Sequence, residues 1–504
     1  MAPTAAASPE AHRARVPAHT MTGETAPGRL DPTYAGVVAR PRSPAPPQLP
    51  PWQAPEPPPD PARVRARLAD LSPLLPPVEG PRLRRRCPVP RAASVHVRDL
   101  ATNRVLVAAR DRMPANPASN LKVVTATAAV ELLGADYRFH TELYVDGADL
   151  ILRGTGDPSL LPRDLYALLD AAEALVDLRA VRRVVADATA FSGDPPPGFV
   201  PSTAPDAYRA PPSALSLQFN TVELVDGPGG YTVRPPSTGV RLLDRRRRRP
   251  APARVLVQPD ASGTRIVLTG GTGLLEAPRA RVLDPPRFVA GVLAAMIATR
   301  TGRPAPAVVT GRVPAHAPLL HVHRSRPLVD LAAASLKYSN NFTAEQLLRA
   351  LGRAATGRPG TTEAGVAAVR AWWRAIGGRD EALVLVNGSG LSHRTRISAR
   401  ALAAVLARVA DPASPSHGLL PSLAVAGQDG TLRGRMREIA GRVRGKTGTL
   451  DGVSALSGIA AAGGRTVAFA VLQNGVRDLA AARAAQDAFV RCLLAALDAP
   501  LDRP

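Results

Sequence analysis

The chain has 504 residues and a formal net charge of +23, with 64 lysines and arginines against 41 aspartates and glutamates. No transmembrane segment is expected, because the most apolar helix-like stretch, residues 288–299, is shorter than the roughly 20 residues that a bilayer requires. The charge suits a nucleic-acid-binding protein, but there is no aromatic-plus-basic ribbon, zinc-ligand spacing or nucleic-acid module, so no nucleic-acid partner is expected. We interpret the excess arginine as a solvated surface, compatible with a polyanionic neighbour such as a cell envelope.

The first part of the chain is predicted to be a tail followed by a hairpin and a helix. Residues 1–61 are rich in proline, alanine and arginine without apolar periodicity, which predicts a disordered tail. No apolar run follows a basic start, so no secretory signal peptide is recognised. A short helix is predicted at 60–75, a β-hairpin at 93–100 and 104–110, and a helix within 117–134.

Residues 137–320 have a different texture, with short strands, prolines and glycines. The patterns predict a hairpin at 139–154, a helix at 162–178 and strands at 183–191, 253–259 and 264–270. Five consecutive arginines, Arg245 to Arg249, are predicted to lie in an exposed loop.

Longer elements follow in residues 321–498. Helices are predicted at 327–352, 362–377, 398–410 and 479–498, and strands at 442–450, 453–462 and 465–475. The order of elements predicts one α+β domain, formed by residues 62–136 and 321–498 and interrupted by the β-rich insertion 137–320. Cys87 and Cys492 flank this domain, and they form a disulfide if their elements touch or are otherwise two unrelated thiols.

Ser119 and Lys122 stand out at the start of the helix in 117–134. They are three positions apart, so they share a face of the helix, at the end where backbone N–H groups favour negative charge. A partly buried lysine can remove the proton of a serine hydroxyl, because desolvation lowers its pKa toward neutrality. Alone, the pair is weak evidence, because such short patterns arise by chance in long chains, and an N-capping serine beside a lysine whose stem lies along apolar surface is the more common explanation.

Two further motifs favour the catalytic interpretation. Ser339, Asn340 and Asn341 interrupt an apolar helical pattern, and Lys446-Thr447-Gly448-Thr449 lies in a predicted strand, where Gly448 lets a ligand approach the backbone. S-x-x-K, S-x-N and K-T-G are the motifs shared by serine β-lactamases and penicillin-binding proteins, and here they occur in that order.

The spacing and the flanking segments resemble one family within this group. Ser119 and Ser339 are 220 positions apart, and the excess length lies in the β-rich insertion. The layout resembles the D-alanyl-D-alanine carboxypeptidase/endopeptidases, which are class C low-molecular-mass penicillin-binding proteins of peptidase family S13. The likeness covers roughly residues 85–495 and includes "RGTGDPSL", "PPSALSLQFNTVEL", "NGSGLSHRTRISARALAAVL" and "AGQDGTLRGRM". It implies a β-lactamase/transpeptidase-like fold, an antiparallel sheet flanked by helices, with a second domain inserted after the nucleophile helix and a third nested inside the second.

The resemblance also implies an activity and roles for residues. The expected reaction is hydrolysis of the D-Ala-D-Ala bond of peptidoglycan stem peptides outside the cytoplasmic membrane, through an acyl-enzyme that β-lactams also form. Ser119 would be the nucleophile, Lys122 the general base and Ser339 a proton relay. Asn341, Lys446, Thr447, Gly448 and Thr449 would bind the substrate. No cofactor and no metal is expected.

The sequence departs from the family pattern at one position, and it leaves two alternative functions open. Asn387 stands in "NGSGLS" where the family usually has aspartate, and an amide can donate as well as accept hydrogen bonds. The alternatives are a β-lactamase or esterase on the same fold, which would hydrolyse its acyl-enzyme quickly, and a non-catalytic envelope-binding scaffold.

Overall fold

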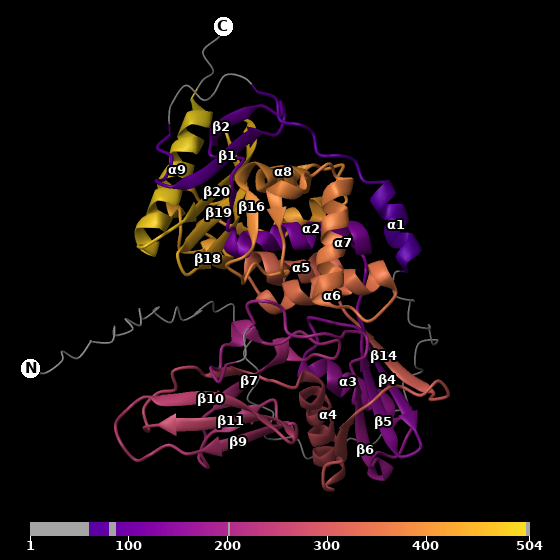
Figure 1. Cartoon of the computed structure of the whole chain (residues 1–504). Helices are drawn as coiled ribbons and strands as arrows, with labels where there is room; N and C mark the ends of the chain where they lie inside the picture. The colour runs from indigo at the N-terminus through magenta and orange to yellow at the C-terminus, as the bar shows by residue number, and fades with distance from the viewer. Residues whose placement is uncertain (1–59, 80–86, 200–201, 500–504) are drawn as a thin grey trace, which may run out of the picture. The chain divides into compact units, whose positions relative to one another are not determined.

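The structure is a computed structural model that describes residues 60–79, 87–199 and 202–499 (Figure 1). The predicted tail, residues 1–61, lies outside the described residues except at its last two positions. There the Asp60 side chain accepts a hydrogen bond from Arg63 N over 2.7 Å and caps helix α1 (Pro61–Ala69). This helix is shorter than the predicted 60–75, and Pro73 disfavours a longer one.

The largest sheet has six antiparallel strands, in the order β17-β18-β19-β20-β1-β2. The predicted hairpin supplies β1 and β2, and the three strands predicted near the end of the chain supply β18, β19 and β20. Because β1 pairs with β20, segments from both ends of the domain complete one sheet. The bounds are β1 (Ala93–Asp99), β2 (Val105–Ala109), β17 (Ala424–Val425), β18 (Val443–Leu450), β19 (Val453–Ala462) and β20 (Arg465–Asn474).

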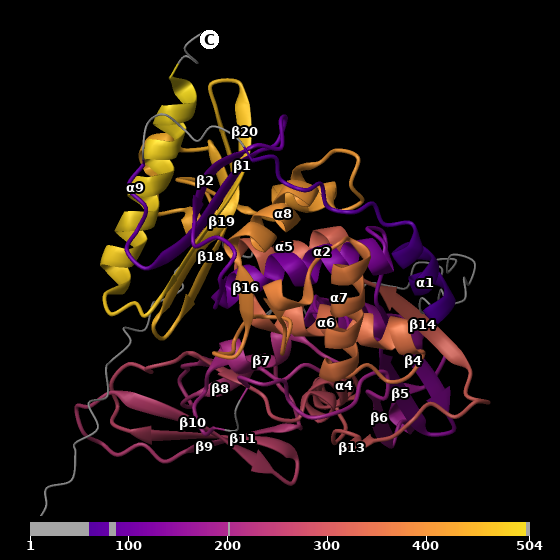
Figure 2. The ribbon, with the colours of Figure 1, turned by 45° about the horizontal axis from the view of Figure 1, so that its top comes forward.

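Both faces of this sheet are buried, which explains its long apolar runs. On β20, Phe469 and Val471 belong to one hydrophobic core, whereas the alternating Ala468 and Ala470 belong to another. Helix α9 (Leu479–Asp498) covers the first face, and α8 (Ala399–Ala410) packs against the second (Figures 1 and 2).

Cys87 and Cys492 form a disulfide, with their Cα atoms 5.6 Å apart. It joins the segment that precedes β1 to α9. Of the two alternatives that the sequence left open, the structure shows the paired one.

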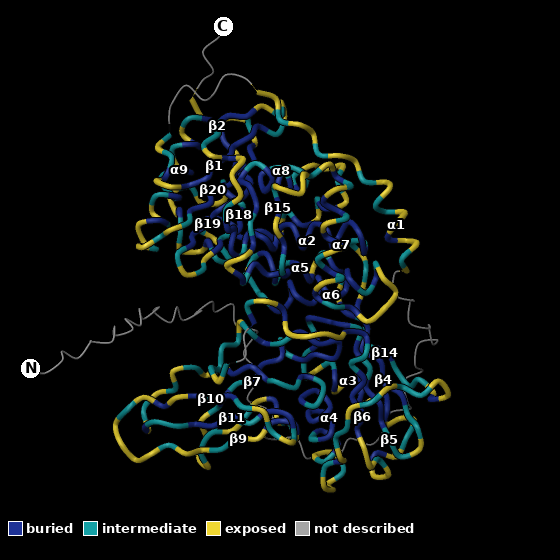
Figure 3. The backbone as a smooth tube through the Cα atoms, viewed as in Figure 1, coloured by how far each residue is buried: buried dark blue, intermediate teal, exposed yellow. Residues whose placement is uncertain are grey.

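The helical side of the domain is built around α2 (Leu121–Leu133), which follows the turn that carries Ser119. All 13 residues of α2 are buried, as expected for a helix that other elements surround (Figure 3). The neighbouring helices are α5 (Leu328–Lys337), α6 (Asn341–Thr356) and α7 (Thr362–Ala375). The prediction of one helix over 327–352 is wrong, because Ser339 adopts a left-handed φ of 61° and separates α5 from α6.

The insertion forms a five-stranded sheet with two helices, and two smaller sheets lie within its chain. The larger sheet has the order β13-β6-β5-β4-β14, and the smaller ones are β10-β11-β9 and β12-β7-β8. The bounds are β4 (His140–Asp146), β5 (Asp149–Gly154), α3 (Pro162–Glu173), β6 (Arg183–Asp187), β7 (Thr221–Val225), β8 (Thr232–Arg234), β9 (Val240–Asp244), β10 (Ala253–Asp260), β11 (Gly263–Gly270), β12 (Arg279–Arg281), α4 (Pro285–Thr301), β13 (Ala307–Thr310) and β14 (Leu319–Arg324). One hydrophobic core runs through the five-stranded sheet, α3, α4 and the smaller sheets. Strand β14 continues beyond residue 320, where the sequence pattern placed the boundary.

A third small sheet, in the order β15-β16-β3, joins β3 (Pro114–Ala115) to β15 (Leu383–Val384) and β16 (Arg396–Ser398). The Arg245–Arg249 run lies in the β9–β10 loop, as predicted, and it is exposed apart from Arg246 (Figure 3). Arg246 pairs with Asp244 at 2.6 Å. Among the residues described, none of the helices has the length and apolarity needed to cross a membrane.

Candidate active site

Ser119 lies in a tight turn, Ala118–Asn120, immediately before α2. Ala118 has a left-handed φ of 46°, which is uncommon for a residue with a side chain, and its N–H donates to Asn116 Oδ1 over 2.8 Å. Asn120 is fully buried, while Ser119 retains part of its exposure. The turn thus presents the hydroxyl of Ser119 outward from a buried frame.

Lys122 is fully buried one turn further along. Its Nζ forms hydrogen bonds to Ser119 Oγ at 2.8 Å and Asn341 Oδ1 at 2.7 Å, and to the Ser389 carbonyl oxygen at 2.7 Å. The Asn341 side chain is oriented by its amide, which donates to the Tyr208 carbonyl over 3.0 Å. All three protons that an ammonium group carries therefore have acceptors.

Two effects lower the pKa of Lys122 well below its usual value. Burial is the larger effect, and the positive charge of Lys446 is the smaller one. Glu345, on α6, acts in the opposite direction through its negative charge. This carboxylate is fully buried and accepts hydrogen bonds from Gly388 N at 3.0 Å and Ser389 N at 2.8 Å. Glu345 therefore holds the loop whose Ser389 carbonyl contacts Lys122.

The second lysine of the site, Lys446, pairs with Ser339. Its Nζ donates to Ser339 Oγ over 2.8 Å and to the Thr447 carbonyl over 2.7 Å. Lys446 is fully buried in β18, and this burial lowers its pKa to about 7. The left-handed backbone of Ser339 aims its side chain at this strand rather than continuing α5.

Close packing joins β18 to the turn that carries Ser119. A Cβ atom on Gly448 would lie 2.6 Å from the Pro117 carbonyl oxygen and 2.7 Å from Asn120 Nδ2, so only glycine allows this approach. Asn341 follows Ser339 by two residues and binds Lys122 directly. The three sequence motifs are thereby brought to one place.

The remaining predicted site residues lie along β18. Thr447 Oγ1 donates to Thr431 Oγ1 over 2.8 Å. Thr449 is exposed and accepts a hydrogen bond from Arg483 Nη2 at 3.3 Å. The predicted site residues fall into two hydrogen-bonded groups. Lys122 joins Ser119 on the turn before α2 to Asn341 at the start of α6. Lys446 joins Ser339, between α5 and α6, to β18, the strand that also carries Thr447, Gly448 and Thr449.

Sequence reasoning did not single out Glu345, Ser389 or Thr431. Glu345 is four residues after Asn341 on the same helix, so the spacing i, i+4 was an available signal. Ser389 acts through its backbone, which leaves no signature in residue type. Thr431 lies within "AGQDGTLRGRM", a segment that carried the family resemblance without a role for any one residue.

Asn387, which stands where the family usually has aspartate, donates a hydrogen bond from its amide nitrogen that an aspartate carboxylate could not donate. Its Nδ2 donates to the Pro197 carbonyl over 2.7 Å, and its Oδ1 accepts from Gly390 N at 2.9 Å. The amide therefore ties the 387–390 loop to the inserted segment. In the part of the chain that the structure describes, no group of three or more His, Cys, Asp or Glu residues could hold a metal ion.

A serine joined to a buried lysine, on a helix packed beside an antiparallel sheet, defines a serine-type hydrolase of the transpeptidase-like class. Residues 87–496 match the D-Ala-D-Ala carboxypeptidase 3 (S13) family. The chain belongs to this family, and it is a serine-type D-Ala-D-Ala carboxypeptidase. The predicted family and the predicted α+β fold are confirmed.

Individual relatives agree. The chain is 34% identical over 421 residues to the D-alanyl-D-alanine carboxypeptidase of Actinomadura sp. (strain R39), covering 76% of this chain and 78% of that protein. It is 28% identical to the D-alanyl-D-alanine carboxypeptidase DacB of Haemophilus influenzae, covering 71% and 80%. The crystal structure of penicillin binding protein 4 from Haemophilus influenzae matches with a TM-score of 0.68 and 25% identity, over 82% of this chain and 98% of that one. The same protein in complex with a β-lactam matches with a TM-score of 0.65.

Proposed function

We propose that Ser119 is the nucleophile and Lys122 the general base of this carboxypeptidase. The observation that carries the proposal is the set of partners around Lys122 Nζ. The side-chain oxygen of Asn341 and the carbonyl of Ser389 can only accept hydrogen bonds, so they take the two N–H groups of a neutral amine. The remaining lone pair faces Ser119 Oγ at 2.8 Å, where it can remove the hydroxyl proton.

The electrostatics of the site support a neutral Lys122. Burial disfavours its charged form, and the adjacent positive charge of Lys446 acts in the same direction to lower its pKa. Glu345 opposes this effect, but its carboxylate is already engaged by two backbone N–H groups.

In the proposed reaction, Ser119 Oγ attacks the carbonyl carbon of the D-Ala-D-Ala peptide bond while Lys122 takes the hydroxyl proton. The N–H groups of Ser119 and Thr449 stabilise the oxyanion, at about 3 kcal/mol per donor. Ser339 relays a proton to the leaving amine of D-alanine, which breaks the peptide bond and leaves the acyl-enzyme. Water then attacks the ester and releases the shortened peptide.

Lys446, Thr447 and Thr449 bind the terminal carboxylate of the substrate, and the Asn341 amide holds its backbone. Lys446 Nζ donates two hydrogen bonds, to Ser339 Oγ and to the Thr447 carbonyl oxygen. Its third proton is available for a charge-assisted hydrogen bond to the carboxylate of the substrate. Because Gly448 has no side chain, β18 can pack against the turn that carries Ser119. A Cβ atom at this position would lie 2.6 Å from the Pro117 carbonyl oxygen.

The substrates we propose are peptidoglycan stem peptides that end in D-Ala-D-Ala, cleaved as a carboxypeptidase or at cross-links as an endopeptidase, outside the cytoplasmic membrane. The family description and the names of the relatives support this specificity. The disulfide between Cys87 and Cys492 supports an oxidising compartment. β-Lactams acylate the same serine, which the β-lactam complex of the Haemophilus influenzae protein supports.

Labelling with a fluorescent penicillin tests the proposal. The purified chain is expected to retain the label for many minutes, and Ser119→Ala is expected to take up none. Ser192→Ala is the matched control, because Ser192 is exposed and lies outside the site. Release of D-alanine from an N-acylated tripeptide ending in D-Ala-D-Ala is measured in parallel. Full labelling of Ser119→Ala refutes the assignment of the nucleophile, and rapid loss of the label indicates a β-lactamase instead.

A further inference from the structure

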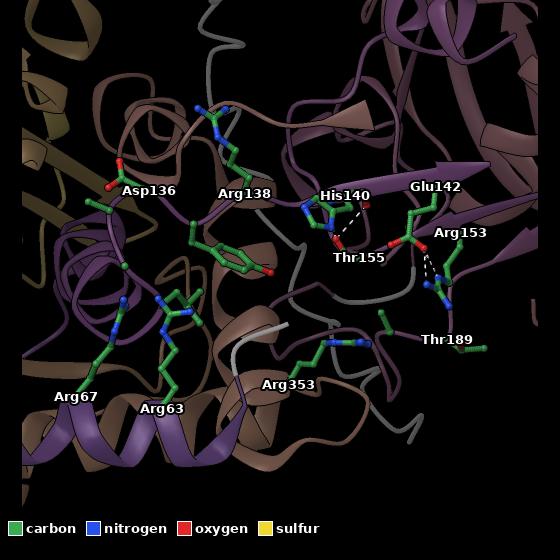
Figure 4. A pocket seen from close by; sticks show the side chains of 16 residues that line it. Arg63, Arg67, Asp136, Arg138, His140, Glu142, Arg153, Thr155, Thr189 and Arg353 are labelled. Carbon is green, nitrogen blue, oxygen red and sulfur yellow. Dashed lines mark hydrogen bonds and ion pairs between the residues drawn. The ribbon is translucent and has the colours of Figure 1, made fainter. Parts of the chain in front are cut away.

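A cavity of about 590 Å³ lies away from the active site residues, bordered by α1, the C-terminal end of α2, strands β4 and β5 and helix α6 (Figure 4). This volume is in the range of small-molecule sites. Its ionisable lining is strongly basic, with five arginines against two acidic residues. They are Arg63, Arg67, Arg138, Arg153 and Arg353, with Asp136 and Glu142.

Two of the arginines already have hydrogen-bond partners, one of them a carboxylate and the other a backbone carbonyl. Arg153 Nε donates to Glu142 Oε2 over 2.6 Å. Arg138 Nη1 donates to the Ser325 carbonyl over 2.6 Å. Asp136 is exposed and forms no ion pair among the described residues. The acidic lining is therefore insufficient to neutralise the remaining guanidinium groups.

Arg63, Arg67 and Arg353 have no side-chain hydrogen bond or ion pair within the described residues. Arg67 Nη1 is buried and has no partner. Its guanidinium packs over Gly134, where a Cβ atom would lie 2.7 Å from Nη2. The C-terminal dipole of α2 at Gly134 favours a cation there, but no carbonyl of the described chain accepts a hydrogen bond from Arg67.

The positions of these side chains favour an extended ligand. Arg63 and Arg67 are four residues apart on α1 and therefore share one face. Figure 4 shows the two side chains rising together from α1, with Arg353 apart from them, toward Thr189 and Glu142. Two separate places in the cavity therefore hold positive charge that the protein does not pair.

We propose that this cavity binds a small ligand carrying at least two oxyanion groups, phosphate or carboxylate. Arg63 and Arg67 bind one group and Arg353 binds the other. Guanidinium groups match both oxyanions through paired hydrogen bonds, and such a ligand supplies the acceptors that Arg67 Nη1 lacks. The site is distinct from the substrate cleft, because it lies at the opposite end of α2 from Ser119 and Lys122.

Isothermal titration calorimetry of the full chain with pyrophosphate and with citrate tests the proposal, at constant ionic strength set with sodium chloride. Saturable binding of at least one of the two ligands is expected. Arg67→Gln and Arg353→Gln are each expected to weaken it at least about tenfold, the equivalent of one charge-assisted hydrogen bond. Arg358→Gln is the matched control, because it removes the same charge from an exposed position outside the cavity.

Comparison of the two affinities shows which oxyanion the cavity prefers. Tighter binding of pyrophosphate indicates phosphate groups, and tighter binding of citrate indicates carboxylates. Binding of neither ligand, or equal binding by the control and the cavity variants, overturns the proposal. Arg63→Gln provides a second cavity variant if Arg67→Gln fails to fold, because Arg63 is exposed. Penicillin labelling of Ser119 is expected to be unchanged in all of these variants, so the outcome is independent of the proposed catalytic roles.

Discussion

Lys122 Nζ and Asn341 Oδ1 are joined by a hydrogen bond of 2.7 Å, although the residues are 219 positions apart and the whole insertion lies between them. The Asn341 amide group in turn donates to the Tyr208 carbonyl, which belongs to the inserted segment. This second bond fixes which end of the amide faces Lys122. The insertion therefore helps to orient the group that binds the proposed base.

Replacement of Lys122 by methionine tests the role of the base. The side chain is fully buried, so methionine preserves much of its volume while removing the amine. We expect the second-order rate constant for penicillin acylation to fall by about 10² to 10⁴, the usual contribution of a general base. Thermal unfolding of the variant serves as the control for folding. An acylation rate within a factor of three of the unsubstituted chain would contradict the role.

The pKa of Lys446 predicts a pH dependence for substrates that carry a carboxylate. Burial lowers this pKa to about 7, so the ammonium is charged below pH 7 and loses its proton above it. We expect kcat/KM for a D-Ala-D-Ala peptide to decrease as the pH rises through about 7, because kcat/KM reports the free enzyme. The matched substrate is the same peptide with a C-terminal amide. The same alkaline decrease for the amide would argue against a carboxylate contact with Lys446.

The sequence predicted the elements that depend on local patterns, but not the contacts that depend on the folded chain. Alternating apolar residues predicted the strands around Phe469, because both faces of that sheet are buried. The ordered motifs predicted that Ser119, Lys122 and Lys446 would meet. The polar residues 339–341 were recognised as an interruption of the helical pattern, but the left-handed backbone of Ser339 that separates α5 from α6 was not predicted. Glu345 received no role from the sequence, although it lies four residues after Asn341, because two of its hydrogen bonds come from backbone N–H groups, which any residue type supplies.

Asn387→Asp is expected to lower stability at neutral pH. Asn387 is fully buried, and a carboxylate there cannot donate to the Pro197 carbonyl, whose oxygen would face another oxygen at about the present 2.7 Å. We expect the free energy of unfolding to fall by about 1–3 kcal/mol at pH 7, from loss of the donor in a buried site. Burial raises the pKa of such a carboxyl in the folded state, so the deficit is present at neutral pH and narrows as acid protonates the group, which can then donate again. Denaturant unfolding at pH 7 and pH 5 measures this difference, and a deficit that grows toward pH 5 would contradict it.

Gly448→Ala tests whether the close approach of β18 to the nucleophile turn sets the geometry of the site. The added methyl group would meet backbone and buried atoms, the Pro117 carbonyl oxygen at 2.6 Å and Asn120 Nδ2 at 2.7 Å, which cannot move without shifting the turn that carries Ser119. We expect a loss of about 1–3 kcal/mol in the free energy of unfolding, which is the usual cost of overpacking, together with slower penicillin acylation. Gly434→Ala is the matched control, because a Cβ atom at Gly434 meets nothing within 4 Å. If the two alanine variants unfold at the same denaturant concentration and acylate at the same rate, β18 does not constrain the turn, and the position of Ser119 must be set by α2 alone.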